Sequence, residues 1–385
     1  MTIRRLTEQK QNWSDAVRPV YRQYPAAIRS SNWLEIVRLC NAGEVDAAME
    51  LAKEQEQRSP QIRAENVIYR RIRVQRVQLL AMRNNSVRTI RAMFRRMAEN
   101  LKDRIERLPN GSPANLRKAS DILHDEIVLL RQSLKSHLTD IVWQSIVMGV
   151  RQMGEAIKPI FRANQESFAD ELADLAYIEH PCVRDLMEAR LSFGISRRLA
   201  ANAKTSVSLR TDKWFNVTDR IYRKITANEV NGLKLSDRIW DLTWRAEMDI
   251  RRALVTDLGS GELSPREVAD RIVRNVYVEG IDSDFQSGPG IYKSPMANAM
   301  RVARTELGRA YSQASAAWAK GKPWIKGLRI VLSDVHEVED ECDKIAGDRI
   351  YTADEVADIL PIHPHCMCHT VYVIDEDYLT KDEAA

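Results

Sequence analysis

Two long stretches of helical periodicity, separated by a short break, constrain the fold of this 385-residue sequence more than any other feature. Before the break, apolar residues recur at intervals of three and four, with a final interval of seven: Val87, Ile90, Phe94, Met97, Leu101 and Leu108. After it, similar spacing continues through Leu123, Ile127, Leu130, Leu134, Leu138 and Ile141. Each set forms one apolar stripe along a helix, and the break, PNGSP at 109–113, contains residues that end helices. The sequence therefore predicts two long helices packed as an antiparallel pair.

The first of these helices is expected over residues 61–108, with an interruption near Asn84 and Asn85. Ahead of it, residues 32–57 carry two short apolar patterns on either side of Gly43. This arrangement predicts a helical hairpin that turns at the glycine. No second copy of the hairpin follows in the sequence, so a helical solenoid is not expected.

Helical patterns continue as far as about residue 320, with helices expected over 237–258 and 295–320. Between them, Ser264 and Glu267 have the spacing of a capping box, with Pro265 at the first helical position. Breaks are expected at Pro159, Pro181, 204–208 and the Gly- and Ser-rich segment 280–294.

Strand character appears only near the C-terminus, in LRIVL at 328–332 and HTVYVI at 369–374. The expected fold is mainly α, with long helical hairpins, a helical body and a small α+β C-terminal domain containing a short β-sheet. We expect an N-terminal helical region at 1–110 with the basic long helix, a helical body at 111–290 and the C-terminal domain at 291–385.

Several protein classes are disfavoured by composition. The most apolar stretch, Ile141 to Val150, is too short and too polar to span a bilayer, and the N-terminus lacks the apolar segment of a secretory signal. We therefore expect no membrane segment and synthesis in the cytoplasm. Five cysteines, an odd number in a long chain, argue against a disulfide scaffold.

Charge is distributed unevenly along the chain. Residues 61–107 contain thirteen Lys and Arg against four Asp and Glu, whereas the segment from Leu332 to the end contains three against fifteen. The basic segment could contact duplex DNA without sequence preference, or an acidic protein surface, or simply be a solvated helix face. It has few aromatic residues, which disfavours single-strand binding. The candidate contact residues are Arg70, Arg71, Arg73, Arg76, Arg88, Arg91, Arg95 and Arg96.

A cluster of His and Cys residues lies between the two expected strands. Three of the five cysteines and four of the seven histidines fall within 336–369. Thiolate and imidazole are zinc ligands, and a structural zinc site takes four of them. The preferred ligands are Cys342, His363, Cys366 and Cys368, with His336 as the competing fourth. Buried free thiols, and a disulfide from Cys342 to Cys366 or Cys368, are the alternatives.

Two motifs make the C-terminal part recognisable. The helix containing ARTE at 303–306, and the pair formed by SDVH with DECD at 333–343 and HPHCMC at 363–368, resemble the phage Mu-F-like head morphogenesis family. The resemblance covers about residues 235–374 and is most specific at its end, although Met367 stands where the family commonly has Arg.

This resemblance implies a minor capsid protein of a bacteriophage virion rather than an enzyme. Its partners would be the portal and capsid proteins, and it would act in head morphogenesis, DNA packaging or DNA ejection. Self-association of the long helices is a further expectation. Arg301, Arg304 and Glu306 would form a structural ion-pair network within the domain.

The same residues give less support to three other protein classes. A ββα metal-dependent nuclease would use His336 as general base and would need a helix with metal ligands after the second strand. An ADP-ribosyltransferase is suggested only by the E-x-E sequence at 337–339. A helical adaptor would bind a protein partner through residues 1–110.

Overall fold

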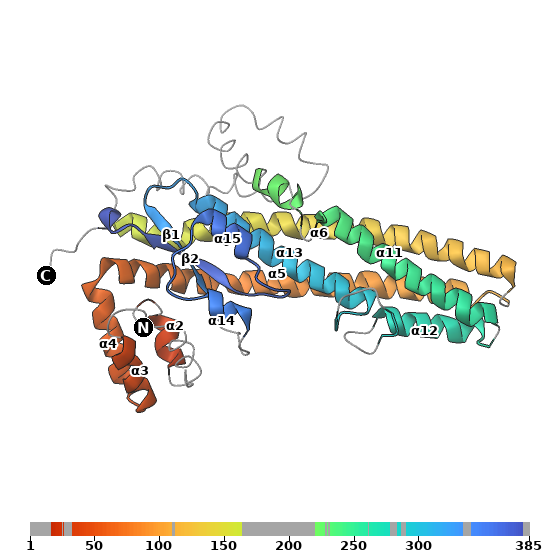
Figure 1. The fold of residues 1–385 in the computed structure, drawn as a ribbon, viewed down its shortest axis with the longest axis horizontal. Helices are drawn as coiled ribbons and strands as arrows, with labels where there is room; N and C mark the ends of the chain where they lie inside the picture. Colours follow the sequence, from red (N-terminus) through yellow and green to blue (C-terminus); the bar gives the residue numbers. More distant parts are fainter. Residues whose placement is uncertain are drawn as a thin grey trace. The chain divides into compact units, whose positions relative to one another are not determined.

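The computed structural model describes residues 17–24, 26, 33–109, 112–163, 220–227, 229, 232–260, 262–277, 283–285, 290–333 and 340–379. It is mainly helical with one small antiparallel sheet, as the sequence predicts (Figure 1). In chain order the elements are α2 (Arg18–Gln23), α3 (Trp33–Asn41), α4 (Val45–Arg58), α5 (Pro60–Ile105), α6 (Pro113–Ala163), α11 (Leu235–Ala253), α12 (Pro265–Tyr277), α13 (Pro295–Ala319), β1 (Ile325–Val331), α14 (Glu341–Ile345), α15 (Ala353–Ile359) and β2 (His369–Ile374).

The chain divides into two compact units. The middle unit contains Leu80–Ser145 and Tyr222–Ala310, and the terminal unit contains Met1–Leu79, Ile146–Ile221 and Tyr311–Ala385. Helices α5, α6 and α13 each contribute residues to both units, and the three consecutive domains expected from the sequence stay a prediction. Among the described helices, none has a stretch long and apolar enough to cross a bilayer.

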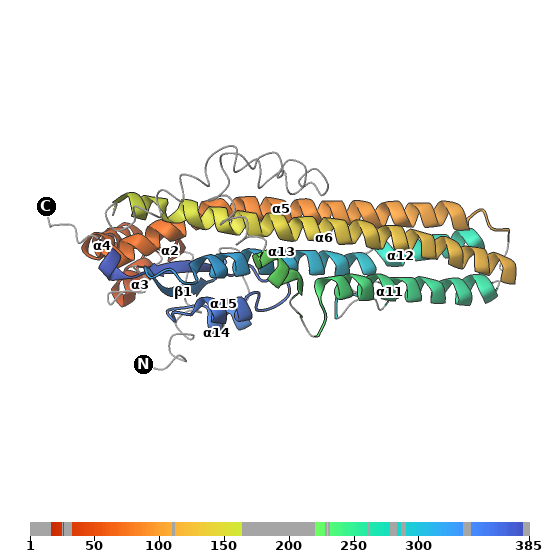
Figure 2. The same ribbon diagram turned by 90° about the horizontal axis from the view of Figure 1, so that it is seen from above.

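The long hairpin of α5 and α6 dominates the middle unit, where the two helices run side by side (Figures 1 and 2). Asn100 and Arg104 both donate to the Glu126 carboxylate, and Ser86 lies 2.9 Å from His137 Nε2. Residues late in α5 contact residues early in α6, and the earlier Ser86 contacts the later His137. The two helices are therefore antiparallel, as expected. The predicted apolar stripe is buried on both helices, except that Leu108 lies beyond the end of α5.

Two expected interruptions do not occur. Helix α5 continues through Asn84 and Asn85, and α6 continues through Pro159. Proline removes one backbone hydrogen bond from a helix, but Ile157, Ile160 and Phe161 around it are buried and hold the last turns in place by packing. The expected breaks at Pro181 and 204–208 lie outside the described residues.

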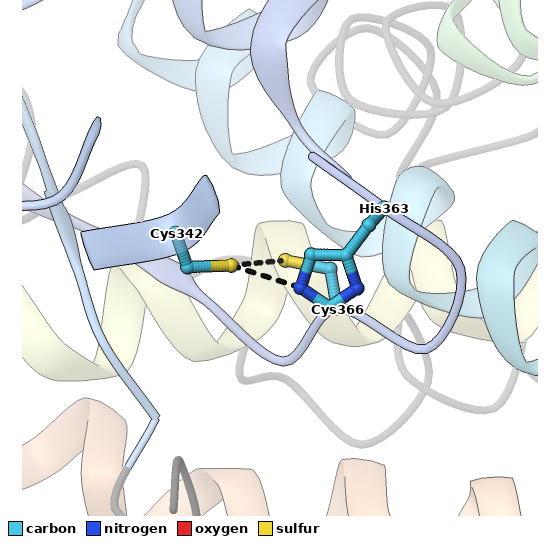
Figure 3. Close-up of side chains that lie close together, drawn as sticks. All are labelled: Cys342, His363 and Cys366. Atoms are coloured by element: carbon cyan, nitrogen blue, oxygen red, sulfur yellow. Dashed lines mark hydrogen bonds between the residues drawn. The ribbon is translucent and has the colours of Figure 1, made fainter. Parts of the chain in front are cut away.

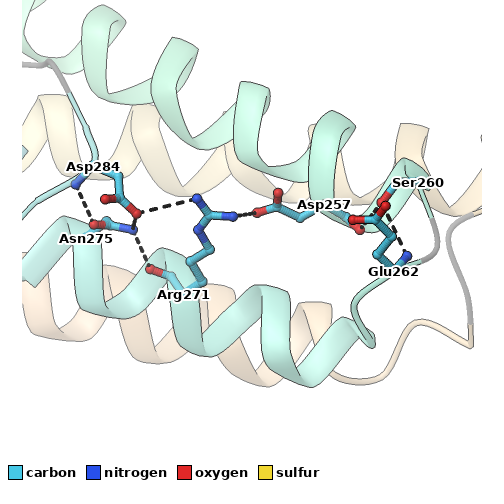
Figure 4. Close-up of polar contacts among 6 residues, drawn as sticks. All are labelled: Asp257, Ser260, Glu262, Arg271, Asn275 and Asp284. Carbon is cyan, nitrogen blue, oxygen red and sulfur yellow. Dashed lines mark hydrogen bonds and ion pairs between the residues drawn. The ribbon is translucent and has the colours of Figure 1, made fainter.

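Helices α11 and α12 also belong to the middle unit. A π-helical turn, Leu254–Leu258, ends α11, and the predicted capping box begins α12, with Glu267 N donating to Ser264 Oγ and Ser264 N donating to the Glu267 carboxylate. Arg271 of α12 bridges Asp257 of the π turn and Asp284 at 3.0 and 3.4 Å (Figure 4). The ion pair with Asp284 holds this residue of the Gly- and Ser-rich segment against α12.

In the terminal unit, α2, α3 and α4 enclose a small core that includes Val17, Val20, Ile36, Cys40 and Ala48. Gly43 adopts φ +82° at the turn between α3 and α4, as predicted from its position. Left-handed backbone of this kind favours glycine because it has no Cβ.

The sheet pairs β1 with β2 in antiparallel register, with Val331 opposite His369 and Leu328 opposite Tyr372. All six residues of β2 are buried. Gly327 of β1 allows the Tyr351 backbone to approach, since a Cβ there would lie 2.8 Å from Tyr351 O. Two hydrogen bonds between the Leu328 and Tyr351 backbones hold the two segments together.

Two arginine contacts attach the sheet to α5 within the terminal unit. Arg329 of β1 forms a 2.7 Å ion pair with Glu65 of α5. Arg76 of α5 lies 2.7 Å from His369 Nδ1 and also donates to Met367 O. The strand pair is therefore anchored to a long helix by charged groups that are themselves largely buried.

Candidate metal centre

Cys342 is positioned by the first turn of α14. Asp340 caps this helix, because its Oδ1 accepts from Cys342 N at 2.6 Å while Asp343 Oδ2 accepts from Asp340 N at 2.9 Å. The sequence DECD therefore forms a capping box with the cysteine inside it. As a result the Cys342 side chain is fixed and only 1% of its surface is exposed.

His363 and Cys366 are positioned by a tight turn. Cys366 N donates to His363 O at 3.1 Å, and His365 between them has φ +67°. Pro364 at the second position and positive φ at the third are features of a type II turn, although glycine or asparagine is more usual than histidine at the third. This turn brings the two flanking side chains to the same side.

The three side chains converge (Figure 3). Cys342 Sγ lies 3.0 Å from His363 Nε2 and 3.7 Å from Cys366 Sγ, and the three ligand atoms all lie within 4.8 Å of one another. In a tetrahedral zinc site two sulfurs stand about 3.8 Å apart, and a sulfur and a nitrogen about 3.6 Å apart. The two sulfurs therefore already have the separation that zinc requires, and the imidazole needs to move by about 0.6 Å.

The His363 ring is oriented by its other nitrogen. Nδ1 lies 2.8 Å from Pro364 O, to which it can only donate. In the neutral ring Nε2 is then the acceptor and faces the Cys342 thiol, whereas the contact with Asp340 Oδ2 at 3.1 Å is favourable only when Nε2 carries a proton. A backbone carbonyl that selects the tautomer in this way is the usual support for a metal-bound histidine.

Charge within the cluster is concentrated on one sulfur. Hydrogen bonds with Cys342 and Cys368 lower the pKa of Cys366. The hydrogen bond with Cys366, then that with Cys368, then burial raise the pKa of Cys342. For Cys368 the hydrogen bond with Cys342 lowers the pKa, but the hydrogen bond with Cys366 and burial raise it to about 12. A thiolate beside two thiols carries a negative charge that attracts a cation to the cluster.

Of the predicted ligands, the structure brings together Cys342, His363 and Cys366. Cys368 is buried, and its thiol influences the pKa values of both other cysteines, but it does not belong to the three-atom group. His336 lies outside the described residues, as does the E-x-E sequence at 337–339. Asp340 beside His363 was not anticipated, although its spacing from Cys342 and Asp343 is that of a helix cap. The four cysteines that the structure describes are free thiols.

Cys342, His363 and Asp340 do not form a Cys–His–Asp catalytic triad. In a Cys–His–Asp triad the acid contacts one ring nitrogen and the thiol the other, whereas here Asp340 and Cys342 both face Nε2. After β2, the described residues contain only a 3₁₀ turn, Glu376–Tyr378, in place of the helix that a ββα nuclease needs.

The basic residues of α5 fall into two groups. Two are engaged, since Arg70 pairs with Glu56 and Arg76 is buried against the sheet; Arg95 donates to Tyr277 Oη at 2.6 Å but remains exposed. The burial of Arg76 removes it from any outer contact face, because its guanidinium is used by His369 and Met367. Arg73 and Arg91 are half-buried, and the exposed side chains are Arg71, Arg88, Arg95 and Arg96.

Around the ARTE motif the acidic residue is fully buried. Glu306 pairs with Arg238 of α11 and, at 3.5 Å, with Arg309 one turn further along α13. Arg301 donates to Asn298 Oδ1 and lies over the Tyr292 ring, and Arg304 is half-buried. The sequence identified Glu306 as an ion-pair residue but not these two partners.

Comparison with protein-family models, with curated proteins and with solved structures finds no match to this chain. The likeness to Mu-F-like head morphogenesis proteins therefore rests on the residues named above.

Proposed function

We propose that this chain is a structural protein whose terminal unit is held together by a zinc ion bound to Cys342, His363 and Cys366. The observation that carries the proposal is the convergence of these three ligand atoms, with a sulfur–sulfur distance of 3.7 Å. Cys342 and Cys366 are 1% and 6% exposed, and buried sites closed by protein ligands are structural rather than catalytic. Cys368 is the proposed fourth ligand, since it is buried two residues from Cys366 and its thiol influences the pKa values of Cys342 and Cys366.

The zinc would join two segments of the chain. Cys342 belongs to α14, and His363 and Cys366 belong to the turn before β2. Both segments lie in the connection between β1 and β2. A structural ion here stabilises the connection against local opening, because metal binding to the folded site is coupled to folding.

The metal proposal is tested by the zinc content of protein purified under reducing conditions. We expect one zinc per chain for the unmodified protein, a loss of zinc in Cys366→Ser, and full retention in Cys40→Ser. Cys40 is the matched control because it is a buried free thiol in the same unit, within the α2–α4 core. A zinc content near zero in the unmodified protein would refute the proposal.

For the biological role, we propose a minor capsid protein of a bacteriophage head, acting at the portal or inner capsid in assembly, packaging or ejection. The motifs at 303–306 and 363–368 support this role through their resemblance to head morphogenesis proteins. The proposed role is structural rather than enzymatic.

Quantitative mass spectrometry of purified phage particles tests this role. The chain should be present in a small number of copies compared with the major capsid protein, and cross-linking should join it to the portal. Its absence from particles, combined with DNA nicking by the purified protein in Mg²⁺, would favour the nuclease instead.

Contact with duplex DNA is a second candidate function, favoured by the exposed arginines on α5. Arg88, Arg95 and Arg96 lie within nine residues in the middle unit. Replacing all three by Gln should weaken non-specific binding and reduce its salt dependence. Unchanged electrophoretic mobility of DNA at low salt with the unmodified protein would exclude this function.

A further inference from the structure

A cluster of arginines surrounds Glu306 in the middle unit. Arg301 and Arg309 belong to α13, as does Glu306, and Arg238 comes from α11. Arg238 pairs with Glu306 Oε1, and Arg309 Nε lies 3.5 Å from the same oxygen. We refer to Arg238, Arg301 and Arg309 as the arginine cluster.

The arginine cluster carries more positive charge than the neighbouring acid can neutralise. The side chains of Arg238 and Arg309 are 15% and 13% exposed, and that of Glu306 is fully buried. Arg301 is also half-buried, and its contacts are the Asn298 amide oxygen and the Tyr292 ring, both uncharged. Among the described residues, three guanidinium groups thus share one carboxylate.

Several donors of the arginine cluster are buried without an acceptor in the described part of the chain. They are Nε and Nη2 of Arg238 and Nε of Arg309. Glu306 is held through Oε1, and its Oε2 also has no hydrogen-bond partner there. Buried guanidinium donors without acceptors are costly, and excess positive charge adds to that cost. Burial and the neighbouring Arg238 both lower the pKa of Arg301, while Tyr292 and Glu306 oppose this.

We propose that the arginine cluster is a binding site for a phosphate group. A tetrahedral oxyanion matches the planar fork of N–H donors on each guanidinium, and its charge offsets the two positive charges left by Glu306. Glu306 holds the Arg238 side chain through Nη1, and Nε and Nη2 of Arg238 and Nε of Arg309 are the donors available to the ligand. This site lies in the middle unit and does not depend on the zinc centre or on the virion role.

Isothermal titration of the full-length protein with inorganic phosphate at low ionic strength tests the site. We expect Arg301→Met to weaken phosphate binding at least tenfold, because it removes a donor group and one positive charge. This variant is chosen because Arg301 contacts Asn298 and the Tyr292 ring, so its loss leaves the buried ion pairs of Glu306 with Arg238 and Arg309 intact. Arg245→Met is the matched control, since Arg245 is an exposed arginine of α11 paired with Asp241.

The unmodified protein should bind phosphate, the control should bind it equally well, and circular dichroism should report the same helix content in all three proteins. Absence of phosphate binding up to millimolar concentrations, or equal weakening in Arg245→Met and Arg301→Met, overturns the proposal.

A second arm identifies the source of the phosphate group. If a short DNA duplex competes with inorganic phosphate and loses affinity in Arg301→Met but not in Arg245→Met, the site takes the nucleic-acid backbone. If phosphate binds and the duplex does not compete, the free ion is the ligand. Both results support a phosphate-group site and assign its source.

Discussion

Zinc uptake by the candidate metal centre should release a defined number of protons. Zinc binds cysteine as thiolate, so every thiol that becomes a ligand must first lose its proton. Near neutral pH Cys366 is the thiolate, because its pKa is lowered, whereas Cys342 and Cys368 keep their protons, because their pKa values are raised. Ligation by all three cysteines therefore releases two protons, and ligation without Cys368 releases one.

The same count sets how zinc affinity depends on pH. Each displaced proton makes the affinity rise about tenfold per pH unit while the thiol remains protonated in the free protein. Two displaced protons give a rise of about a hundredfold per pH unit. The affinity must rise with pH, since alkaline conditions help the thiols to lose their protons.

Isothermal titration with zinc in two buffers of different ionisation enthalpy measures the proton count directly. Cys368→Ser should lower it from two to one, and Cys40→Ser should leave it at two, because Cys40 lies in the separate α2–α4 core. Zero released protons would show that the thiols are not zinc ligands. An unchanged count in Cys368→Ser would remove Cys368 from the ligand set.

Three further outcomes test the packing. Gly327→Ala should destabilise the terminal unit by about 1–3 kcal/mol in urea unfolding, because the new methyl meets Tyr351 O; unchanged stability would mean that the Tyr351 segment can move away at no cost. Phe94→Ala should lower stability by about 3–5 kcal/mol, whereas Val77→Ala on the same helix, 65% exposed, should have little effect; similar losses would contradict the assigned apolar stripe. Burial lowers the pKa of His137 below 6.5, so the unfolded chain binds its proton first and stability should fall as pH drops below 6.5. His137→Asn should reduce that fall in acid unfolding curves, and equal curves would contradict it.

Sequence periodicity predicted the helical framework because burial of one face decides where a long helix forms. The stripe from Val87 to Leu101 and the stripe from Leu123 to Ile141 are buried. The expected break at Pro159 was wrong, since a single missing hydrogen bond is outweighed when apolar neighbours such as Ile157 and Ile160 are packed on both sides.

At the metal centre, the sequence predicted the ligand types and three of the residues that meet. Cys366 and His363 are close in sequence, so a short turn suffices to bring them together. The proximity of Cys342 depends on the fold of the connection between the strands, which spacing alone does not determine. Asp340 was missed, although local capping chemistry contained the signal.

Contacts between distant segments were beyond sequence reasoning. Arg76 was expected on an outer basic face but is buried against His369, 293 residues away. Likewise, the partners of Glu306 include Arg238, 68 residues earlier. Periodicity gives the face on which a residue lies, but the element that covers that face is set by tertiary packing.

The position of the cysteines between the two strands also bears on how fast the sheet can form. Before β1 and β2 pair, the chain must close a loop of the 37 residues between Val331 and His369. An ion already joining Cys342 to Cys366 bypasses the 23 residues between them and leaves an effective loop of 14. The closure entropy then falls by about 0.9 kcal/mol, which corresponds to strand pairing that is roughly fourfold faster. If zinc binds as proposed, zinc supplied before the strands pair would accelerate the pairing of β1 with β2.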